Sequence, residues 1–553
     1  MSKGTRLGFA LAPALCAAMI GCGGDRGDAQ VAALEKLAHP ASVTPAPDHS
    51  NKYLGDPKAI ALGHQLYFDS DFSGPATLLD MLNRPMTTAG RAAAGVRPKI
   101  ACATCHDLAH GGSDPTPDPP GHVVSIGAGA YDVNGQQTIG AAFDRLVYWD
   151  GRNDSLWAQI AAVEESPVSM NGSRLRVAWR IADAYRAAYT DLFGGDWPLP
   201  PELDSVAMQQ ARLAPDGTCK MVAGACPTDL CHVVMSDGNT VCLPRFPLEG
   251  RPGYVAPGAA PQCDWGTTDP LQPNGDAFDC MDLADQLAVD RIYVNFAKAI
   301  AAYEYTLIPK DGAFDQWMDS GMTGTQLSAA AARGAALFVG KAACNGCHQG
   351  PLFTDQKFHD IGVPQAGSTY VPTVDECPAG GWCDCVSDDT HAPTNCLPNG
   401  LRDGLRKLKV NKFRRDSRWS DDLDCQNHFS LHTDLNYAME HPTECDGMDG
   451  FYAANLDDSQ KGQWKTPSLR NVSQTAPYMH DGYFATLEDV VKHYNDAGMN
   501  TPGPKVGMVD QKFQQLNLTD GEVSDLVEFL KALDSPIDPA AAAMPTVPAT
   551  SNF

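Results

Sequence analysis

The stretch Cys102-Ala-Thr-Cys105-His106 and its counterpart Cys344-Asn-Gly-Cys347-His348 decide the fold of this chain. Each offers two thiols that form thioethers with the vinyl groups of a haem, and a histidine that becomes the proximal ligand of the iron. A bare Cys-x-x-Cys is also typical of a zinc half-site or a thiol redox pair. Because a histidine follows both pairs directly, the sequence predicts two covalently attached c-type haems, with His106 and His348 as iron ligands.

The N-terminus has the pattern of an export signal. Lys3 and Arg6 precede an apolar run over residues 7–20, as in a secretory signal peptide, and Ile20-Gly21-Cys22 resembles a bacterial lipoprotein box. We therefore expect a lipoprotein-type signal over residues 1–22 and a periplasmic protein with an acylated Cys22. An ordinary signal that is cleaved off together with Cys22 stays open. No other segment reaches the ~20 apolar residues that span a bilayer, so we expect membrane contact only through such a lipid anchor.

The remaining cysteines also indicate export. Of the 18 cysteines, four belong to the haem motifs and two, Cys16 and Cys22, to the signal, which leaves 12. Even, clustered counts in an exported chain predict disulfides, whose pairing the sequence does not supply. The stretch from Cys226 to His232 is a widened Cys-x4-Cys-His, and a third haem there stays open. The 12 form two clusters of six: Cys219, Cys226, Cys231, Cys242, Cys263 and Cys280, then Cys377, Cys383, Cys385, Cys396, Cys425 and Cys445.

Hydrophobic periodicity predicts a mostly α protein with two cytochrome c-like haem domains, each carrying a disulfide-rich irregular insertion. Helical spacing is found after Asp56-Pro57, after Asp154, and over residues 296–307, 329–338, 487–494 and 523–533. It is lost over about 195–285 and about 366–454, where the cysteines cluster. We therefore expect a signal (1–22), a flexible tether (23–50), an N-terminal haem domain (51–310), a C-terminal haem domain (311–535) and a Pro/Ala-rich tail (536–553).

The net charge of the chain is −26. A surface this acidic repels nucleic acid, so we exclude nucleic-acid binding. It attracts a basic partner protein, at a rate that falls with salt.

In their order and spacing, the motifs resemble those of the bacterial di-haem cytochrome c peroxidases and their MauG-like relatives. Beyond the two haem motifs the likeness rests on Leu62-Gly63, Tyr148-Trp-Asp-Gly-Arg152, Thr466-Pro-Ser-Leu-Arg-Asn471 and Thr475-Ala-Pro-Tyr-Met-His-Asp-Gly482. The resemblance implies an exported peroxidase that reduces hydrogen peroxide at the N-terminal haem. The C-terminal haem would take electrons from an external donor such as a small basic cytochrome c or another periplasmic redox protein. Many members of the family dimerise, which leaves a homodimer open.

The resemblance also assigns residues to the N-terminal haem. Trp149 matches the tryptophan between the two haems, although a buried core tryptophan would give the same pattern. Gln159 matches the distal glutamine, which accounts for a polar residue on an apolar helix face. The distal acid of the family, ten residues later, falls on Ser169, which cannot transfer a proton unaided. Glu165 is the predicted substitute, and an ordinary exposed glutamate is the alternative.

At the C-terminal haem, Tyr494 stands fourteen residues after His480, where the classical peroxidases have a methionine ligand and the MauG-like enzymes a tyrosine. A phenolate ligand lowers the potential of the iron and favours its higher oxidation states. Tyr494 as a core residue of its apolar stripe stays open. Together with Ser169 it keeps two other functions open. One is a MauG-like oxidase that acts on a partner protein or organic substrate through a bis-ferryl state, and the other is a non-catalytic electron carrier or redox sensor.

Classical members of the family block the resting peroxidatic iron with a loop histidine. His122 is the candidate, but Ile126 occupies the matching place when counted back from Trp149. We therefore favour an open iron.

The interdomain calcium site of the family matches Asn134, with the backbone oxygens of Thr475 and Pro477. Ligation by oxygen alone suits Ca²⁺. A simple turn asparagine is the alternative.

Overall fold

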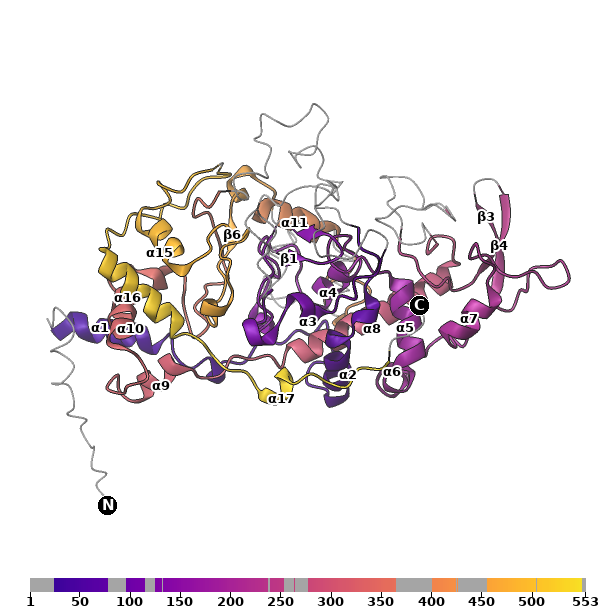
Figure 1. Ribbon diagram of the computed structural model, residues 1–553, viewed down its shortest axis with the longest axis horizontal. Coiled ribbons are helices and arrows are strands. Elements are labelled where there is room, and N and C mark those ends of the chain that lie inside the picture. Colours follow the sequence, from indigo (N-terminus) through magenta and orange to yellow (C-terminus); the bar gives the residue numbers. More distant parts are fainter. Residues whose placement is uncertain are drawn as a thin grey trace, which may run out of the picture.

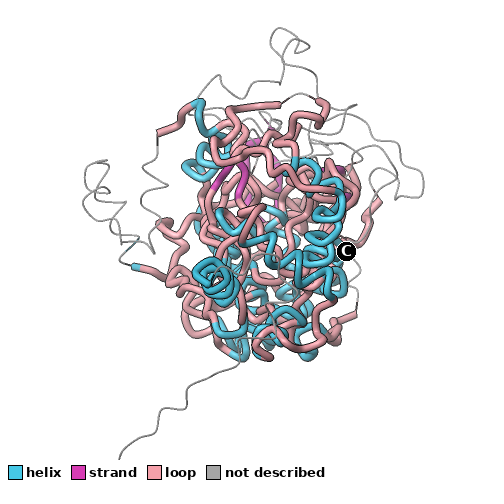
Figure 2. Tube along the Cα trace, turned by 90° about the vertical axis from the view of Figure 1, so that its left-hand side faces the viewer, coloured by secondary structure: helices cyan, strands magenta, loops and turns pink. Residues whose placement is uncertain are grey.

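The computed structural model describes residues 24–77, 96–114, 125–131, 133–236, 239–252, 263, 277–364, 400–423, 425, 455–503 and 505–549. Figure 2 shows that helices and loops dominate this part of the chain. The described strands form three antiparallel pairs: β1 (Ser125–Ile126) with β2 (Ala130–Tyr131), β3 (Cys231–Ser236) with β4 (Asn239–Pro244), and β5 (Phe358–His359) with β6 (Trp464–Lys465). The expectation of a mostly α protein is confirmed.

The first hydrophobic core, here called the N-terminal lobe, is built around the long helix α8. This helix packs against α2, α4 and α5. A Cβ on Gly63 of α2 would lie 1.9 Å from the backbone oxygen of Ala299, so only glycine lets the two helices approach this closely. The helices of this lobe are α2 (Pro57–Phe68), α3 (Cys102–Cys105), α4 (Leu156–Glu164), α5 (Arg174–Ala184), α6 (Arg186–Phe193), α7 (Val206–Arg212) and α8 (Leu283–Glu304).

The second core, here called the C-terminal lobe, centres on α10 packed against α16. Gly334 makes this contact close, because a Cβ there would lie 2.0 Å from the backbone oxygen of Asp525. Thr519 caps α16 in a capping box with Glu522, and Thr486 caps α15. The helices of this lobe are α9 (Ala313–Asp319), α10 (Ala329–Val339), α15 (Leu487–Asn495) and α16 (Asp520–Lys531).

The predicted flexible tether is wrong over much of its length. Residues Gly24–Glu35 form helix α1, which packs against α10 at one end of the molecule (Figure 1). Leu34, Leu37 and Ala38 are buried in the core of the C-terminal lobe. The Ala-rich composition suggested a linker, but alanine is also the best helix former, and a few leucines suffice to dock such a helix.

Part of the second insertion packs on the N-terminal lobe. The predicted boundary, which placed the whole insertion in the C-terminal haem domain (311–535), is therefore wrong. Helix α11 (Leu401–Val410) packs on the N-terminal lobe, where a Cβ on Gly404 would lie 1.7 Å from the backbone oxygen of Asp150. Phe413 and Trp419 are part of the core of the N-terminal lobe. The buried Lys298 amine of α8 donates to the Trp419 carbonyl at 2.8 Å. This segment therefore joins the two lobes.

The Pro/Ala-rich tail returns to the N-terminal lobe. It includes helix α17 (Pro539–Ala542) and runs beneath the molecule in Figure 1. The Tyr303 hydroxyl donates to the Ala541 carbonyl at 2.7 Å. The buried Arg180 donates to the carbonyls of Pro548 and Ala549. The tail therefore ties the end of the C-terminal lobe to helices α5 and α8.

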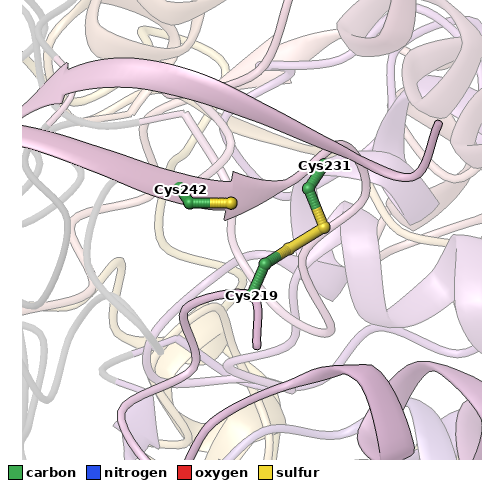
Figure 3. A group of neighbouring side chains, drawn as sticks. All are labelled: Cys219, Cys231 and Cys242. Carbon is green, nitrogen blue, oxygen red and sulfur yellow. A yellow bond between two sulfur atoms is a disulfide. The ribbon is translucent and has the colours of Figure 1, made fainter. Parts of the chain in front are cut away.

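The first cysteine cluster forms three disulfides, Cys219–Cys231, Cys226–Cys242 and Cys263–Cys280. Figure 3 shows the first of these beside Cys242 at the β3–β4 hairpin. Because Cys226 and Cys231 are both oxidised, the open alternative of a third haem on this pair is ruled out. In the second cluster Cys425 is also disulfide-bonded. The other five cysteines of that cluster lie outside the described residues.

Candidate haem sites

The N-terminal haem motif lies at the end of a short helix. Helix α3 holds Cys102 and Cys105, and His106 follows as its C-cap. The His106 Nδ1 donates to the Gly112 carbonyl at 3.1 Å, and the Tyr67 hydroxyl donates to the His106 carbonyl at 2.8 Å. With Nδ1 occupied, the Nε2 lone pair is left for a ligand in the adjoining cavity, which all three motif residues line.

The C-terminal haem motif repeats this arrangement. Residues Cys344–Gly346 form a 3-10 turn, and the His348 Nδ1 donates to the Phe353 carbonyl at 2.9 Å. Cys344, Cys347 and His348 line a second cavity. Burial raises the pKa of the Cys344 thiol to about 12, so this sulfur is not a free thiolate.

Both motifs fit a covalently attached haem. Among the described cysteines, the four of the two motifs form no disulfide, whereas the cysteines of the first cluster are disulfide-bonded. Burial lowers the pKa of both His106 and His348, which favours the neutral imidazole that an iron ligand must be. Paired thiols beside an oriented imidazole are the donor set that a c-type haem requires.

Helix α4 lies across the N-terminal cavity from the haem motif. Ser155 caps its N-terminus, and one face of the helix lines the cavity with Gln159, Ile160, Val163 and Glu164. The Gln159 amide donates to the Tyr148 hydroxyl at 3.3 Å. The Arg152 guanidinium lies 3.3 Å over the Tyr148 ring, and both residues also line the cavity. Gln159 therefore lines the same cavity as His106, and its role as the distal glutamine stays a prediction.

The structure corrects the predicted role of Glu165. Its carboxylate accepts two hydrogen bonds from Arg174, at 2.8 and 2.6 Å, and does not line the cavity. Glu164 lines it instead, with 2% of its surface exposed and Oε1 without a hydrogen-bond partner among the described residues. Successive side chains of a helix point in directions about 100° apart. At the end of α4, the Glu164 side chain therefore lines the cavity, whereas the next side chain, that of Glu165, pairs with Arg174. Ser169, which stands where the family has its distal acid, also lines the cavity.

The C-terminal cavity has an aromatic opposite side. Tyr494 of α15 lines it, and burial raises the pKa of its phenol. Trp464 of β6 stacks on His480 with ring centroids 3.9 Å apart, and both residues line the same cavity. The sequence analysis missed this stack, because the two residues belong to separate motifs and no spacing rule links them.

Trp149 lies between the two cavities. Among the residues described as lining them, Trp149 alone borders both. Its indole Nε1 donates to the Asn134 carbonyl at 2.9 Å, and its own carbonyl accepts from the Lys465 backbone N–H at 2.9 Å. The indole is therefore held by contacts to both lobes.

The predicted calcium ligands lie together between the lobes. Asn134, Thr475 and Pro477 line a third cavity. The Asn134 side-chain amide contacts the Pro477 carbonyl, and its backbone N–H donates to the His480 carbonyl at 2.6 Å. Calcium binding by the oxygens of these residues stays a prediction.

Two predictions fall on residues outside the described ranges. His122, the candidate blocking ligand, is one of them. The other is the export signal with Cys22. Within the described ranges, none of the helices is both long and apolar enough to cross a membrane.

Comparison with known proteins agrees with this geometry. The sequence profile of the family described as di-haem cytochrome c peroxidase matches residues 57–214. Cytochrome-c peroxidase IdrP1 of Denitromonas iodatirespirans is 25% identical over 480 residues, which cover 86% of this chain and 81% of the relative. IdrP1 of a Pseudomonas strain is 23% identical, with 92% and 90% covered. Methylamine utilization protein MauG of Methylorubrum extorquens is 28% identical over 250 residues, with 45% and 46% covered.

Proposed function

Because the chain belongs to the family of di-haem cytochrome c peroxidases and MauG-like proteins, whose members are oxidoreductases, we propose that it reduces hydrogen peroxide in the His106 cavity. The electrons come from the His348 cavity through Trp149. The family implies two c-type haems, and the two Cys-x-x-Cys-His cavities fit them. When bound, the haems supply the iron at which peroxide is reduced and through which electrons pass.

The position of Trp149 carries this proposal. The indole of Trp149 borders both cavities. Electron transfer through this aromatic ring would be faster than direct transfer through the space between the two redox centres. Its hydrogen bond to Asn134 and its backbone contact to Lys465 fix its position relative to both lobes. The same contacts place the relay beside the proposed calcium site of Asn134, Thr475 and Pro477.

The residues opposite His106 suit a small polar substrate. Gln159 supplies an amide, and Arg152 and Tyr148 line the same cavity. The rest of the lining is largely apolar, with Ile160 and Val163 on the same helix face. This arrangement leaves a few polar groups to orient peroxide in a largely apolar cavity.

The electron donor that we propose is a small basic cytochrome c. The net charge of −26 supports a cationic partner, whose rate of association falls as salt screens the attraction. A periplasmic location, with a lipid anchor at Cys22, is part of the same proposal and follows from the N-terminal sequence alone.

A second candidate is a MauG-like oxidase that withdraws electrons from a partner protein or an organic substrate. The observation that favours it is Tyr494, which lines the C-terminal cavity together with Cys344 and His348. A phenolate at this position would disfavour reduction of the C-terminal haem by a cytochrome donor. Reaction with peroxide without prior reduction would support this candidate over the first.

Steady-state turnover of the haem-loaded protein with peroxide and a reduced basic cytochrome c tests the leading proposal. We expect turnover well above that of free haem, and a loss of roughly tenfold or more in Trp149→Phe, which corresponds to about 1.4 kcal/mol in barrier. Trp197→Phe is the matched control, because Trp197 is exposed and lines neither cavity. Turnover no faster than free haem would contradict peroxidase activity. Equal rates in Trp149→Phe and the wild type would contradict the electron route alone.

A further inference from the structure

We propose that Glu164 is the residue that moves the proton when the O–O bond of peroxide breaks in the N-terminal cavity. The inference rests on the proposed reduction of peroxide in this cavity. It assigns the proton transfer to a residue that stands neither at the predicted position, Glu165, nor at the position where the family carries its acid, Ser169.

The placement of the side chain is the first argument. Glu164 follows Gln159 by five residues on α4, and both side chains line the cavity opposite His106. Its Oε1 is buried and has no hydrogen-bond partner among the described residues. A buried carboxyl without a partner costs free energy, and such groups persist where function requires them. Its partner is therefore best sought in what enters the cavity.

The surroundings hold this carboxyl by packing. A Cβ on Gly172 would lie 2.0 Å from the Glu164 Oε1, and the Gly172 backbone N–H donates to the Glu164 carbonyl at 2.8 Å. The neighbouring Glu165 is anchored on Arg174, which fixes the end of α4. The absence of a side chain at Gly172 therefore leaves the space that the Glu164 carboxyl occupies.

The cavity contains a second buried carboxyl, that of Glu304 on α8. Glu304 and then Glu164 exert the largest charge effects on Cys102, so both carboxyls lie near the thioether edge. Glu164 has a buried Oε1 without a hydrogen-bond partner among the described residues, and it lies on α4, the helix that also carries Gln159. The proton transfer is therefore assigned to Glu164.

The proton transfer is balanced as follows. The Glu164 carboxylate takes a proton from one oxygen of H₂O₂ and returns it to the other oxygen. As the O–O bond breaks, the oxygen that has gained the proton keeps the bonding electron pair and leaves as water, and the remaining oxygen would draw two electrons from the haem side of the cavity. The remaining oxygen becomes a second water when it takes up two further protons. The external donor then supplies two electrons, which return the haem side to its starting oxidation state.

The surroundings of Glu164 also set the pH dependence. Burial raises the pKa of Glu164 well above its ordinary value, the charge of Glu165 adds to this, and Arg176 opposes it. Because the first step needs the carboxylate, the rate of reaction with peroxide should rise with pH through this raised pKa. The other charged or titratable groups that interact with Glu164 are Asp69, Arg251, Cys102 and Tyr293.

Stopped-flow mixing of the haem-loaded protein with peroxide across pH tests the assignment. In Glu164→Gln we expect the rate to fall by roughly 10²–10⁴-fold, the usual contribution of a positioned acid–base group, and its pH dependence to disappear. Glu165→Gln is the comparison variant, adjacent in sequence and equal in chemistry. It should keep the rise of rate with pH, moved to lower pH because the charge of Glu165 no longer raises the pKa of Glu164. Infrared spectroscopy gives a readout independent of activity, because the C=O band of a protonated buried carboxyl should be missing only in Glu164→Gln.

Two more variants keep the test decisive if Glu164→Gln folds poorly. Gly172→Ala retains the carboxyl but displaces it, and should give an intermediate loss with normal haem content. Ser169→Glu added to Glu164→Gln returns a carboxyl to the same cavity and should restore part of the rate. A wild-type rate and pH profile in Glu164→Gln would overturn the assignment and leave peroxide reduction standing. If the wild type itself does not react with peroxide, the proposed function fails, and this inference fails with it.

Discussion

The N-terminal and C-terminal cavities have the same kind of haem motif but differ in the residues that line the rest of each cavity. In both, a Cys-x-x-Cys-His motif places a buried histidine whose Nδ1 is bound to a backbone carbonyl. On the opposite side, α4 brings Gln159 and Glu164 to the first cavity, whereas α15 brings Tyr494 to the second. The Cys-x-x-Cys-His motif would attach the haem in both cavities. The side chains of α4 or α15 would then determine which chemistry each cavity supports.

The residues of α4 and α15 that line the two cavities suit different reactions, one with proton transfer and the other with electron transfer. A carboxyl and a carboxamide can exchange protons with a small substrate. A phenol beside the stack of Trp464 and His480 offers a ligand and aromatic contacts, which suit electron storage and transfer. In the proposed function, one fold therefore divides a proton-coupled reaction and electron supply between two sites that Trp149 connects.

The largest expected effect separates the two cavities by removing one haem at a time. Cys102→Ala with Cys105→Ala should abolish the reaction with peroxide, because its site of reduction is lost. Cys344→Ala with Cys347→Ala should keep a single reaction with peroxide but lose turnover with the cytochrome donor. Intact-protein mass should show one haem fewer in each variant. Donor-driven turnover in either variant would contradict the division of roles.

Replacing the phenol sharpens the comparison on the C-terminal side. Tyr494→Met should raise the potential of the C-terminal haem by on the order of 0.1 V or more, since axial ligands tune haem potentials over about 0.8 V. Spectroelectrochemistry measures this shift. Tyr483→Phe is the control, because its hydroxyl donates to the Pro502 carbonyl outside the cavity. An unchanged potential in Tyr494→Met would show that Tyr494 is a core residue.

A smaller effect tests the attachment of α11 to the N-terminal lobe. Gly404→Ala should lower the free energy of unfolding by about 1–3 kcal/mol, because the new methyl group would clash with the Asp150 backbone oxygen. The spectrum of the N-terminal haem should shift more than that of the C-terminal haem. Gly195→Ala is the control, since a Cβ there meets nothing within 4 Å. Denaturant titration and haem absorption measure both effects.

The smallest effect concerns His359, whose imidazole bridges Asp355 and Asp510 at 3.0 and 2.7 Å. The hydrogen bond with Asp355 contributes most to raising the pKa of His359 from 6.5 to about 10. The resulting stability is present below pH 6.5 and is lost as pH rises through about 10. His359→Gln should therefore cost about 0.5–1.5 kcal/mol at neutral pH and less at high pH. His110→Gln, which removes an exposed pair with Asp107, is the control and should cost less stability at neutral pH.

The sequence determined the elements with strong local signals. Asp56-Pro57, Thr486 and Thr519 predicted the starts of three helices that the structure contains, because capping depends on residues a few positions apart. The haem motifs were legible for the same reason, since both thiols and the histidine lie within five residues. The disulfides of the first cluster were expected from its cysteine count, but their pairing was not.

Only the tertiary structure decided which side chain faces which cavity and which segment joins which lobe. Glu165 and Glu164 have the same chemistry, and the packing of α4 alone turns one to Arg174 and the other to the cavity. The sequence did not predict where three segments pack: helix α1, helix α11 and the C-terminal tail. Their packing partners lie hundreds of residues away in the sequence, beyond the reach of local patterns. Local spacing specifies a motif, whereas the direction of a side chain depends on contacts that chain folding alone creates.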